Sequence, residues 1–447
     1  MTAEPSCPGD ERPGTGGRPV VVVPHGTGSV PLLQVAAAAR PIADVVWLVD
    51  SSDPAVGASL RMLRRFGSVV DAAGLHPDQV AAAVAPYRPS GVLPLLDRDL
   101  VPLADLAVRL GLPFHSPVVA TRLSDKLVQR RALAEGGVPV PGSWEVPGTS
   151  VPEALARLSG QVGFPAVLKP RAGAGSRRTV PVADLAGLAA ALAALAGRGV
   201  LPEPMLVEEY LPGRAGDGRR PFAEFVSVET VVERGGIHHL SVTGRLPLVE
   251  PFRETGSFVP SALGAEDTEA VLGAATDALE ALGVAHGCCH TEVKLTPDGP
   301  RIIEVNGRMG GGVPDMLRVA TGLDLIGLCV RLAVGEPARL ERPLRFDGVG
   351  YWLFLQPPAT ARTVRSIGGM RAVAELPGVE DVFPHLRPGD LVDPWRGTDT
   401  FVMAVLGKAA DHAGVRRANE LAHEAADVVY DRSDDPIGDG AAKGAAA

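Results

Sequence analysis

Residues 301–312 read RIIEVNGRMGGG and set three polar side chains in an apolar, β-branched run. Glu304, Asn306 and Arg308 occupy alternate positions, so in an extended strand their side chains leave the same face. Glu292 lies in the preceding run CHTEVKLT, and the TPDGP between the runs has the residues of a tight turn. We therefore predict a β-hairpin that brings two carboxylates and an amide oxygen together. Such hard oxygens suit Mg²⁺ carrying nucleotide phosphates, and an edge hairpin with solvated carboxylates is the structural alternative.

The composition predicts a globular enzyme that binds neither nucleic acid nor membrane. The chain has 447 residues, 46% hydrophobic and 21% charged, which allows two to four domains at about 100–200 residues each. Its net charge of −9 and its lack of long Lys/Arg blocks fit a small-molecule enzyme. The apolar runs are too short for a bilayer, and the N-terminus MTAEPSCPGDERPG lacks the basic and apolar regions of a signal peptide. We therefore expect a cytoplasmic protein.

The four cysteines predict neither disulfides nor a metal centre. Cys7 lies in a Pro/Gly-rich stretch, Cys288 and Cys289 are adjacent, and Cys329 sits in an apolar pattern. No CxxC or Cys/His metal spacing occurs. Buried free thiols are the preferred interpretation.

The N-terminal part of the chain alternates strand and helix patterns. The runs PVVVV, DVVWLVD and SVVD are separated by helical segments, which indicates a parallel α/β sheet. The loop HGTGS after the first run, with Asp50 as a ribose acid, raises an NAD site as one reading. Only Gly26 and Gly28 of the dinucleotide fingerprint are present, so we interpret the loop as a structural βα turn.

Two lysines lie beside segments with clear local signals. Lys126 is near the start of a predicted helix, and Lys169 comes before a glycine-rich loop. Ser124 is the expected N-cap of a helix that carries Asp125 and Lys126 in its first turn and stops before Pro139. GFPAVLKP places Lys169 on a short strand ahead of the loop RAGAGSRR. A glycine-rich loop with available amides and cationic side chains can fold over polyphosphate, whereas a mobile hairpin loop is the alternative. The loop is not a P-loop, because GxxxxGK[ST] is absent.

The central segments predict a hinge strand, antiparallel strands and a helix. PMLVEEYLPG is an apolar strand whose backbone could read an adenine edge, or a strand with two exposed acids. FAEFVSVETVVERGGIHHLSVTGRLPLVE alternates apolar and polar residues around a Gly-Gly turn, which favours antiparallel strands. AEDTEAVLGAATDALEALG is a helical pattern that leads into the hairpin.

Taken in order, these segments resemble the ATP-grasp superfamily and, within it, the L-amino acid ligases. The series is SDK, FPAVLKPRAGAGS, LVEEYLPG, SVETVV, HTEVKLTPDGPRIIEVNGRMGG and GLDLIGLCVRLAVGEP, over residues 123–337. YWLFLQPPATARTVRSIGG and LPGVEDVF then look like the C-terminal domain of L-amino acid ligases. That domain favours this branch over the purine-biosynthetic ligases and biotin carboxylases.

The resemblance implies a mixed α/β and α+β fold. It has an N-terminal parallel α/β (pre-ATP-grasp) domain, a two-lobed ATP-grasp fold and a small appended C-terminal α+β domain. The expected divisions are a disordered tail at 1–18, the N-terminal domain at 19–115, a linker helix and small lobe at 116–205, the large lobe with the metal site at 206–340, the ligase-type C-terminal domain at 341–431, and a disordered tail at 432–447.

The resemblance also implies a nucleotide site. Two lysines would contact the α and β phosphates, and the glycine-rich loop would close over the γ phosphate. An acid and the hinge backbone would hold adenine, and the candidate ribose acid stands one position out of the usual register. The residues implied for ATP are Lys126, Lys169, Gly173, Gly175, Ser176, Glu208, Glu209, Tyr210, Leu211 and, out of register, Glu224.

A metal and substrate site is implied beside it. The hairpin carboxylates and amide would bind Mg²⁺, usually as two ions, with Mn²⁺ as an alternative. The arginine would stabilise charge on the transferring phosphoryl group, and an upstream acid would receive the substrate's amino group. The residues are Glu292, Glu304 and Asn306 for metal, Arg308 for catalysis, and Arg253, Glu254, His290, Met309, Gly310 and Gly311 for substrate.

The implied reaction is ATP-dependent amide formation. ATP phosphorylates a carboxylate, and an amine attacks the acyl phosphate to release phosphate. The enzyme would be an ADP-forming acid–amino-acid (peptide) ligase of specialised metabolism, such as antibiotic biosynthesis, acting on small carboxylates and amines. The resemblance also implies a homodimer as one possible oligomeric state, because ATP-grasp ligases are often dimers. We interpret His290 as a packed or substrate-contacting residue in preference to a base for the amine.

Two alternatives stay open. One is an ATP-grasp ligase or carboxylase of primary metabolism, although no biotin-carrier segment of the MKM type occurs. The other is a nucleotide-binding regulatory protein with a degenerate site, against which the intact lysines and carboxylates argue. The three glycines of MGGGVP lack side chains, so the acceptor pocket is hypothesised to be roomy and to prefer large or peptidic amines.

Overall fold

The computed structural model describes residues 17–432 apart from 29, 148, 149, 202, 215–220, 341 and 342. The predicted tails and Cys7 lie outside the described residues, except that 17, 18 and 432 are described and Arg432 ends a strand. The chain forms two compact units, Met1–Pro117 with Asp324–Arg339, and Val118–Leu323 with Leu340–Ala447. Among the described residues no helix has both the length and the apolarity of a membrane span.

The first unit contains the predicted parallel sheet, in the order β3-β2-β1-β4. The strands β1, β2 and β4 are mostly buried apolar runs, as expected when helices cover a parallel sheet, whereas the edge strand β3 has one buried residue. The helix α11 (Leu325–Ala333) packs in this unit, although the sequence placed it in the large lobe at 206–340. A Cβ on Gly91 would lie 1.7 Å from the Ala333 carbonyl oxygen, so this contact requires glycine. The other elements are β1 (Val20–His25), α1 (Leu32–Ala39), β2 (Asp44–Val49), α2 (Pro54–Phe66), β3 (Ser68–Asp71), α3 (Pro77–Val84), β4 (Gly91–Val92) and α4 (Leu100–Leu110).

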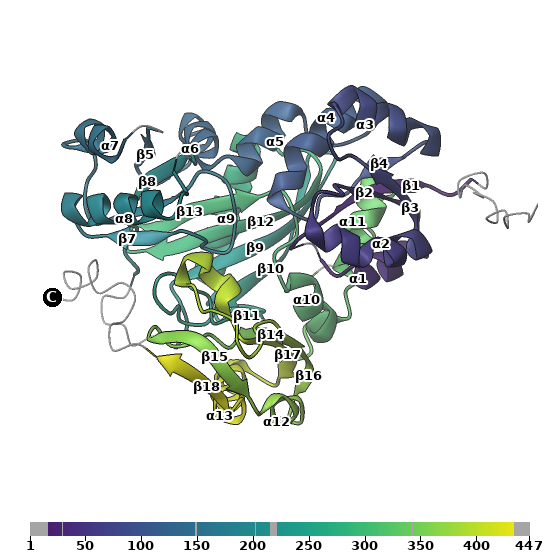
Figure 1. Ribbon diagram of the computed structural model, residues 1–447. Helices are drawn as coiled ribbons and strands as arrows, with labels where there is room; N and C mark the ends of the chain where they lie inside the picture. The colour runs from purple at the N-terminus through teal and green to yellow at the C-terminus, as the bar shows by residue number, and fades with distance from the viewer. Residues whose placement is uncertain are drawn as a thin grey trace, which may run out of the picture. The chain divides into compact units, whose positions relative to one another are not determined.

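The second unit begins with two helices and a four-stranded antiparallel sheet, ordered β5-β8-β6-β7 (Figure 1). The cap of the second helix differs from the prediction. Ser124 ends α5, and the Asp125 carboxylate accepts hydrogen bonds from the Leu127 and Val128 amides at the start of α6. Both residues are good caps, and the continuation of α5 decides between them. The elements are α5 (Pro117–Ser124), α6 (Lys126–Glu135), β5 (Ser143–Val146), α7 (Val151–Leu158), β6 (Ala166–Pro170), β7 (Val180–Val182), α8 (Leu185–Gly197) and β8 (Met205–Glu209).

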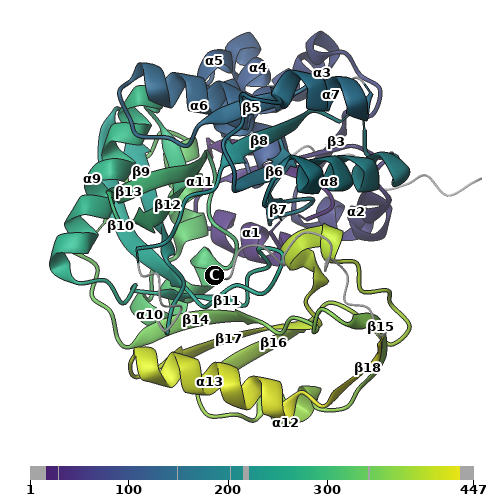
Figure 2. The same cartoon turned by 90° about the vertical axis from the view of Figure 1, so that its left-hand side faces the viewer.

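An eight-stranded sheet forms the rest of this unit, in the order β13-β12-β9-β10-β11-β14-β17-β16. Its first five strands precede residue 340 and its last three follow it, so the expected boundary between large lobe and C-terminal domain divides strands that share one sheet. Figure 2 shows α9 along β9, β10, β12 and β13, and α13 across β14 and β17. The strands are β9 (Phe225–Glu233), β10 (Gly236–Arg245), β11 (Gly256–Val259), β12 (Gly287–Thr296), β13 (Gly299–Asn306), β14 (Val349–Phe354), β16 (Val379–Pro384) and β17 (Met403–Ala409).

The remaining elements complete the C-terminal part of the second unit. β15 and β18 form a separate antiparallel pair, and an irregular 3₁₀ segment, η3, is kinked at Gly397. Cys288, Cys289 and Cys329 are buried free thiols, as predicted for the cysteines that are described. The elements are α9 (Ala265–Leu282), α10 (Val313–Thr321), β15 (Ala361–Ile367), α12 (Met370–Ala374), η3 (Pro394–Thr400), α13 (His412–Ala425) and β18 (Val428–Arg432).

Candidate active site

The predicted hairpin is confirmed as β12 and β13, which pair antiparallel around the turn of TPDGP. Glu292 lies opposite Glu304, and His290 lies opposite Asn306. Residues opposite each other in an antiparallel pair share a face with their Cβ atoms about 4.5–5.5 Å apart. The two carboxylates are therefore neighbours.

Lys126 joins this hairpin to the glycine-rich loop. Its Nζ donates to Glu304 Oε1 at 2.7 Å and to the Gly173 carbonyl oxygen at 2.7 Å. The side chain is buried at the first residue of α6, and the Lys126 amide donates to the Arg171 carbonyl oxygen at 2.9 Å. One lysine thus fixes the position of the loop relative to a candidate metal ligand.

Lys169 sits in a second buried ion pair. Its Nζ lies 2.5 Å from Glu208 Oε2, while Arg130 Nε lies 2.9 Å from Glu208 Oε1. Burial alone would raise the pKa of Glu208, but the charges of Arg130 and Lys169 outweigh it and hold the pKa below its ordinary value. The Glu208 carboxylate therefore positions Lys169, and its predicted contact with adenine stays a prediction.

The loop RAGAGSRR has the backbone that its glycines allow. Gly173 and Gly175 have φ of 117° and 67°, and Ser176 also has a positive φ of 55°. Arg171 anchors the start of the loop through Asp125 Oδ2 at 2.6 Å and Glu145 Oε1 at 2.5 Å. The far end is contacted by η3, because the Thr398 amide donates to the Gly175 carbonyl oxygen at 2.9 Å.

The predicted hinge follows directly from β8. The Glu209 amide donates to the Gly142 carbonyl oxygen at 2.8 Å, and the Tyr210 amide donates to the Pro165 carbonyl oxygen at 3.2 Å. The two residues are exposed, and Leu211 is half-buried. These bonds occupy the Glu209 and Tyr210 amides, so contact between the hinge and adenine stays a prediction. The strand β8 pairs with β6, which carries Lys169.

Glu224 lies one residue before β9 with its carboxylate against Gly213, where an added Cβ would lie 1.4 Å from Glu224 Oε2. Its charge also acts on Lys294, whose pKa is lowered mainly by burial. A role for Glu224 in binding ribose stays a prediction.

A group of buried charges surrounds His290. The Nδ1 atom of His290 lies 2.9 Å from Glu229 Oε2, and Ser227 and Thr243 hydroxyls donate to Glu229 Oε1. Burial would lower the pKa of His290, but the Glu229 carboxylate outweighs it and raises the pKa to about 9. Arg245 lies 3.5 Å from the other ring nitrogen. His290 is therefore a packed, charged residue that faces Glu292 with Nε2 at 3.7 Å.

Glu254 and Arg308 lie close enough to this group to interact with it electrostatically. Arg245 Nε is 3.6 Å from Glu254 Oε2. Burial raises the pKa of Glu254, and the charge of Glu292 adds to that rise. Burial would likewise raise the pKa of Glu292, but His290, Arg245 and Arg308 lower it to about 2. The predicted substrate acid, metal ligand and catalytic arginine are thus brought together.

Arg253 does not join them, although it neighbours Glu254. Its side chain is buried, and its guanidinium donates to the Pro357 carbonyl oxygen at 3.2 Å and to the Glu250 carbonyl oxygen at 2.8 Å. It ties the loop to the segment after β14. A substrate role for Arg253 therefore has no support from its contacts.

The three consecutive glycines have different surroundings. A Cβ on Gly310 would meet His290 Nδ1 at 2.4 Å, and one on Gly312 would meet the Trp352 ring at 2.9 Å. A Cβ on Gly311 would have nothing within 4 Å. Two of the glycines therefore admit neighbouring rings, and only Gly311 borders open space. Met309 beside them is buried.

The hairpin residues fit a divalent cation held jointly with phosphate. Asn306 Oδ1 is buried without a hydrogen-bond partner, and the opposed pair Glu292 and Glu304 lies two residues nearer the turn of the same hairpin. Among the described residues no three His, Cys, Asp or Glu side chains are grouped as a metal site. Mg²⁺ often takes one or two carboxylates and completes its shell with phosphate and water.

The loop HGTGS in the first unit has a structural partner. The Asp53 carboxylate accepts hydrogen bonds from the Thr27 amide and hydroxyl, each at 2.7 Å, and Arg98 donates to the Thr27 carbonyl oxygen. Asp50 accepts hydrogen bonds from Ser52 two residues on. These contacts support the structural turn over the NAD reading.

Sequence reasoning missed three charged residues of the site. Glu229 interrupts the apolar strand FVSVETVV, and a buried acid needs a partner, which was a usable signal. Arg130 follows Lys126 by one helical turn, so it lies on the same face of α6. Arg245 ends β10, and no local pattern distinguishes it.

Comparison with known proteins assigns the domain. Residues 162–315 match the family model of the ATP-grasp domain. This part of the chain is an ATP-grasp domain. It contains Lys169, the glycine-rich loop and the whole hairpin, whereas Lys126 and η3 lie outside it.

Similarity to curated proteins extends beyond residues 162–315. The uncharacterized protein y4rH of Sinorhizobium fredii (strain NBRC 101917 / NGR234) is 30% identical over 67% of this chain and 60% of its own length. The alanine–anticapsin ligase of Bacillus subtilis (strain 168) is 28% identical over 54% of this chain and 53% of its own. The chain therefore spans less than two thirds of either relative.

The solved L-amino acid ligase from Bacillus licheniformis has the same fold. It superposes with a TM-score of 0.74 at 21% identity and covers 93% of this chain and 99% of that one. The predicted fold class is confirmed: a parallel α/β sheet in the first unit and an ATP-grasp fold in the second.

Proposed function

We propose that this chain is an ATP-dependent carboxylate–amine ligase that joins amino acids or peptides through an acyl phosphate and releases ADP and phosphate. The observation that carries the proposal is the double contact of Lys126. One ammonium group bridges the glycine-rich loop at Gly173 and the hairpin carboxylate Glu304. A phosphate-binding loop and a metal-binding carboxylate joined in this way suit transfer of a phosphoryl group.

ATP would bind between the loop and the hinge. Lys126 and Lys169 supply positive charge for the phosphates, and loop amides with positive-φ glycines can approach phosphate oxygens. The hinge backbone at Glu209–Leu211 can meet an adenine edge. Binding of phosphate would replace the Glu304 carboxylate as the partner of Lys126 and release that carboxylate toward a cation.

Glu292, Glu304 and the buried Asn306 oxygen would hold Mg²⁺. When bound, the metal neutralises phosphate charge and orients the phosphates for attack. A second ion, Mn²⁺ as a substitute, and the pairing of these particular ligands are part of the proposal. The pKa of about 2 keeps Glu292 ionised for this role at neutral pH.

The substrate carboxylate would lie among the cations Arg308, Arg245 and His290. Phosphorylation converts a poor leaving group into a good one, and Arg308 stabilises the charge that develops on the phosphoryl group. Burial and the charge of Glu292 raise the pKa of Glu254, and a substrate ammonium group beside it would favour the ionised carboxylate. An amine then attacks the acyl carbonyl and phosphate leaves.

The relatives support an amino acid as one substrate. The name of the B. subtilis relative gives alanine as a substrate of a ligase. A place in specialised metabolism is the corresponding proposal for this chain.

Replacing one hairpin carboxylate tests the proposal. ADP release is measured with ATP, Mg²⁺ and a mixed panel of amino acids and peptides, and mass spectrometry identifies the condensed product. Glu304→Ala is expected to abolish turnover, at least about 100-fold, because it removes a metal ligand rather than core packing. Asp298→Asn, in the exposed turn of the same hairpin, is the matched control and should leave turnover unchanged.

Two outcomes would contradict the proposal. Unchanged Mg²⁺-dependent activity in Glu304→Ala would show that Glu304 is not a required metal ligand. ATP binding without ADP release from any carboxylate and amine pool would favour the regulatory alternative.

A further inference from the structure

A segment from the C-terminal part of the chain packs against the glycine-rich loop. We define residues 393–400, which contain η3, as the docking segment. The Arg178 amide donates to the Trp395 carbonyl oxygen at 2.9 Å, and the Thr398 amide donates to the Gly175 carbonyl oxygen at 2.9 Å. A Cβ on Gly397 would lie 2.2 Å from that same Gly175 oxygen. The segment therefore touches the loop backbone on both sides of Arg177.

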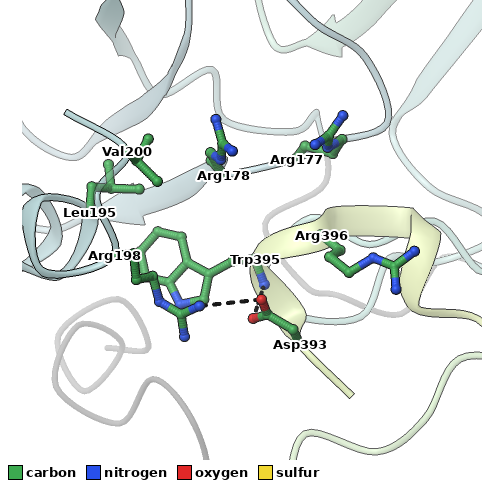
Figure 3. A pocket seen from close by; sticks show the side chains of 8 residues that line it. All are labelled: Arg177, Arg178, Leu195, Arg198, Val200, Asp393, Trp395 and Arg396. Carbon is green, nitrogen blue, oxygen red and sulfur yellow. Dashed lines mark hydrogen bonds and ion pairs between the residues drawn. The ribbon is translucent and has the colours of Figure 1, made fainter. Parts of the chain in front are cut away.

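Side-chain contacts attach the start of the docking segment to the C-terminal end of α8. Arg198, at the end of α8, lies 3.2 Å from Asp393 Oδ2 and 5.4 Å from the Trp395 ring centre. Figure 3 shows the Arg198 guanidinium beside the Trp395 indole, with Arg177 and Arg178 of the loop nearby. A stacked, paired guanidinium holds its partners more firmly than an exposed ion pair alone.

The other side of the docking segment holds the backbone of Glu254. The Glu254 amide donates to Thr398 Oγ1 at 3.1 Å. Gln356 Nε2 donates both to the Glu254 carbonyl oxygen at 2.9 Å and to the Thr398 carbonyl oxygen at 3.0 Å. Thr398 is buried, so loss of either contact leaves a polar group without water to replace it.

We propose that Thr398 is a positioning residue that couples nucleotide binding to the position of Glu254. This coupling rests on the proposed function, which assigns the glycine-rich loop to ATP and Glu254 to the substrate's amino group. Thr398 meets the loop with its backbone amide and the Glu254 backbone with its hydroxyl. A shift of the loop at Gly175 therefore acts through one residue on Glu254, and binding thermodynamics makes the effect reciprocal.

A purely structural role would have a different result. If the docking segment only stabilised the fold, loss of the Thr398 hydroxyl would lower stability equally with and without nucleotide. Coupling requires that the change seen at Glu254 on nucleotide binding depends on that hydroxyl. The size expected for one hydrogen bond is roughly a 3- to 10-fold change.

Hydrogen exchange of the full chain tests the coupling without any need for turnover. Amide exchange is followed by mass spectrometry with and without Mg²⁺ and the non-hydrolysable ATP analogue AMP-PNP. In the native chain, nucleotide is expected to slow exchange in peptides from 171–178 and, by roughly 3- to 10-fold, in peptides covering 250–256. Thr398→Val should still show slower exchange at 171–178 with nucleotide, because valine preserves the shape and the backbone amide. It should lose the slower exchange at 250–256, because valine lacks the hydroxyl that contacts Glu254.

Thr398→Ser is the matched control and should restore the nucleotide effect at 250–256, because serine keeps the hydroxyl. Gly397→Ala perturbs the loop side and should also lose the effect, since its Cβ would displace Gly175. Persistence of the effect in Thr398→Val, or its absence in the native chain while 171–178 responds, would overturn the proposal. If Thr398→Val does not fold, the comparison of Gly397→Ala with the native chain decides it by the same criterion.

Failure of the ligase proposal would be recognised separately. ADP release with the substrate panel reports on ligation, whereas the exchange experiment needs only nucleotide binding. Coupling with no ADP release would overturn the ligase function and leave the link between loop and Glu254 intact.

Discussion

The glycine-containing loops after β1 and after β6 meet groups of opposite charge. The loop after β1 has Gly28 at φ 82°, and the loop after β6 has Gly175 at φ 67°. In the first, the Asp53 carboxylate takes the Thr27 amide and hydroxyl. In the second, the Lys126 ammonium donates to the Gly173 carbonyl oxygen. Glycine supplies the backbone conformation in both loops. A neighbouring ammonium group would attract phosphate, whereas in the first loop the Asp53 carboxylate accepts the hydrogen bonds that a phosphate would accept.

The largest effect is expected when the positive charge beside the second loop is removed. Lys126→Ala removes the ammonium group that donates to Gly173 and should lower ADP release by about 10²–10³-fold, the loss typical of a preorganised donor for developing charge. If no substrate pair releases ADP, affinity for Mg²⁺ and AMP-PNP is the measurement.

Lys408→Ala is the matched control, because Lys408 makes an exposed ion pair with Asp347 at 2.8 Å in the same unit. It should behave as the native chain does. Equal rates of ADP release for Lys126→Ala and Lys408→Ala would contradict the phosphate-binding role proposed for the second loop.

A matched pair of glycine substitutions separates backbone strain from function. Gly28→Ala and Gly175→Ala each force alanine into the left-handed region, at a cost of about 1 kcal/mol. Both variants should unfold at slightly lower temperature. Only Gly175→Ala should reduce ADP release, by about 5-fold, which corresponds to about 1 kcal/mol. A similar loss of activity in Gly28→Ala would place the first loop in the active site after all.

The smallest effect is expected at Asp53 and concerns stability alone. Hydrogen bonds from Thr27 hold the pKa of Asp53 at about 2, below the ordinary 3.8. A lowered pKa stabilises the fold fully above the ordinary value, and that stabilisation is lost as pH falls through about 2. Asp53→Asn should lower the unfolding midpoint by a few degrees at neutral pH, by less toward pH 2, and leave ADP release unchanged.

The unfolding midpoint measured from pH 5 to pH 2 checks this. Asp44→Asn, whose carboxylate lies 3.7 Å from Arg18 in the same unit, is the control and should retain the acid dependence of the native chain. An Asp53→Asn variant whose unfolding midpoint depends on pH as that of the native chain does would contradict this role of Asp53.

Local patterns predicted the elements that carry the site, because turns and strand alternation depend on neighbouring residues. The hairpin with Glu292 and Glu304, the strand with Lys169 and the parallel sheet were all predictable. The helix cap was misplaced by one residue, since Ser124 and Asp125 are both good caps. Only the continuation of α5 through Ser124 chose between them.

Contacts between distant segments were not predictable from spacing. Glu229 and His290 lie opposite each other because β9 pairs with β12 in one register, and a shift by one residue would turn Glu229 to the other face. The contact of Thr398 with Gly175 and Glu254 joins three segments of the second unit that no short motif relates. Such pairings depend on how the sheets are ordered.

By itself the sequence determined which residues could bind phosphate and metal: two lysines, two glutamates and loops whose glycines permit positive φ. The tertiary structure decided which charge each loop meets, through Asp53 for one and Lys126 for the other. It also decided that Glu208 holds Lys169 and that Arg253 faces the C-terminal segment. The physical reason is that residue type sets what a group can bind, whereas the partner of a buried charge depends on strand register and packing between distant segments.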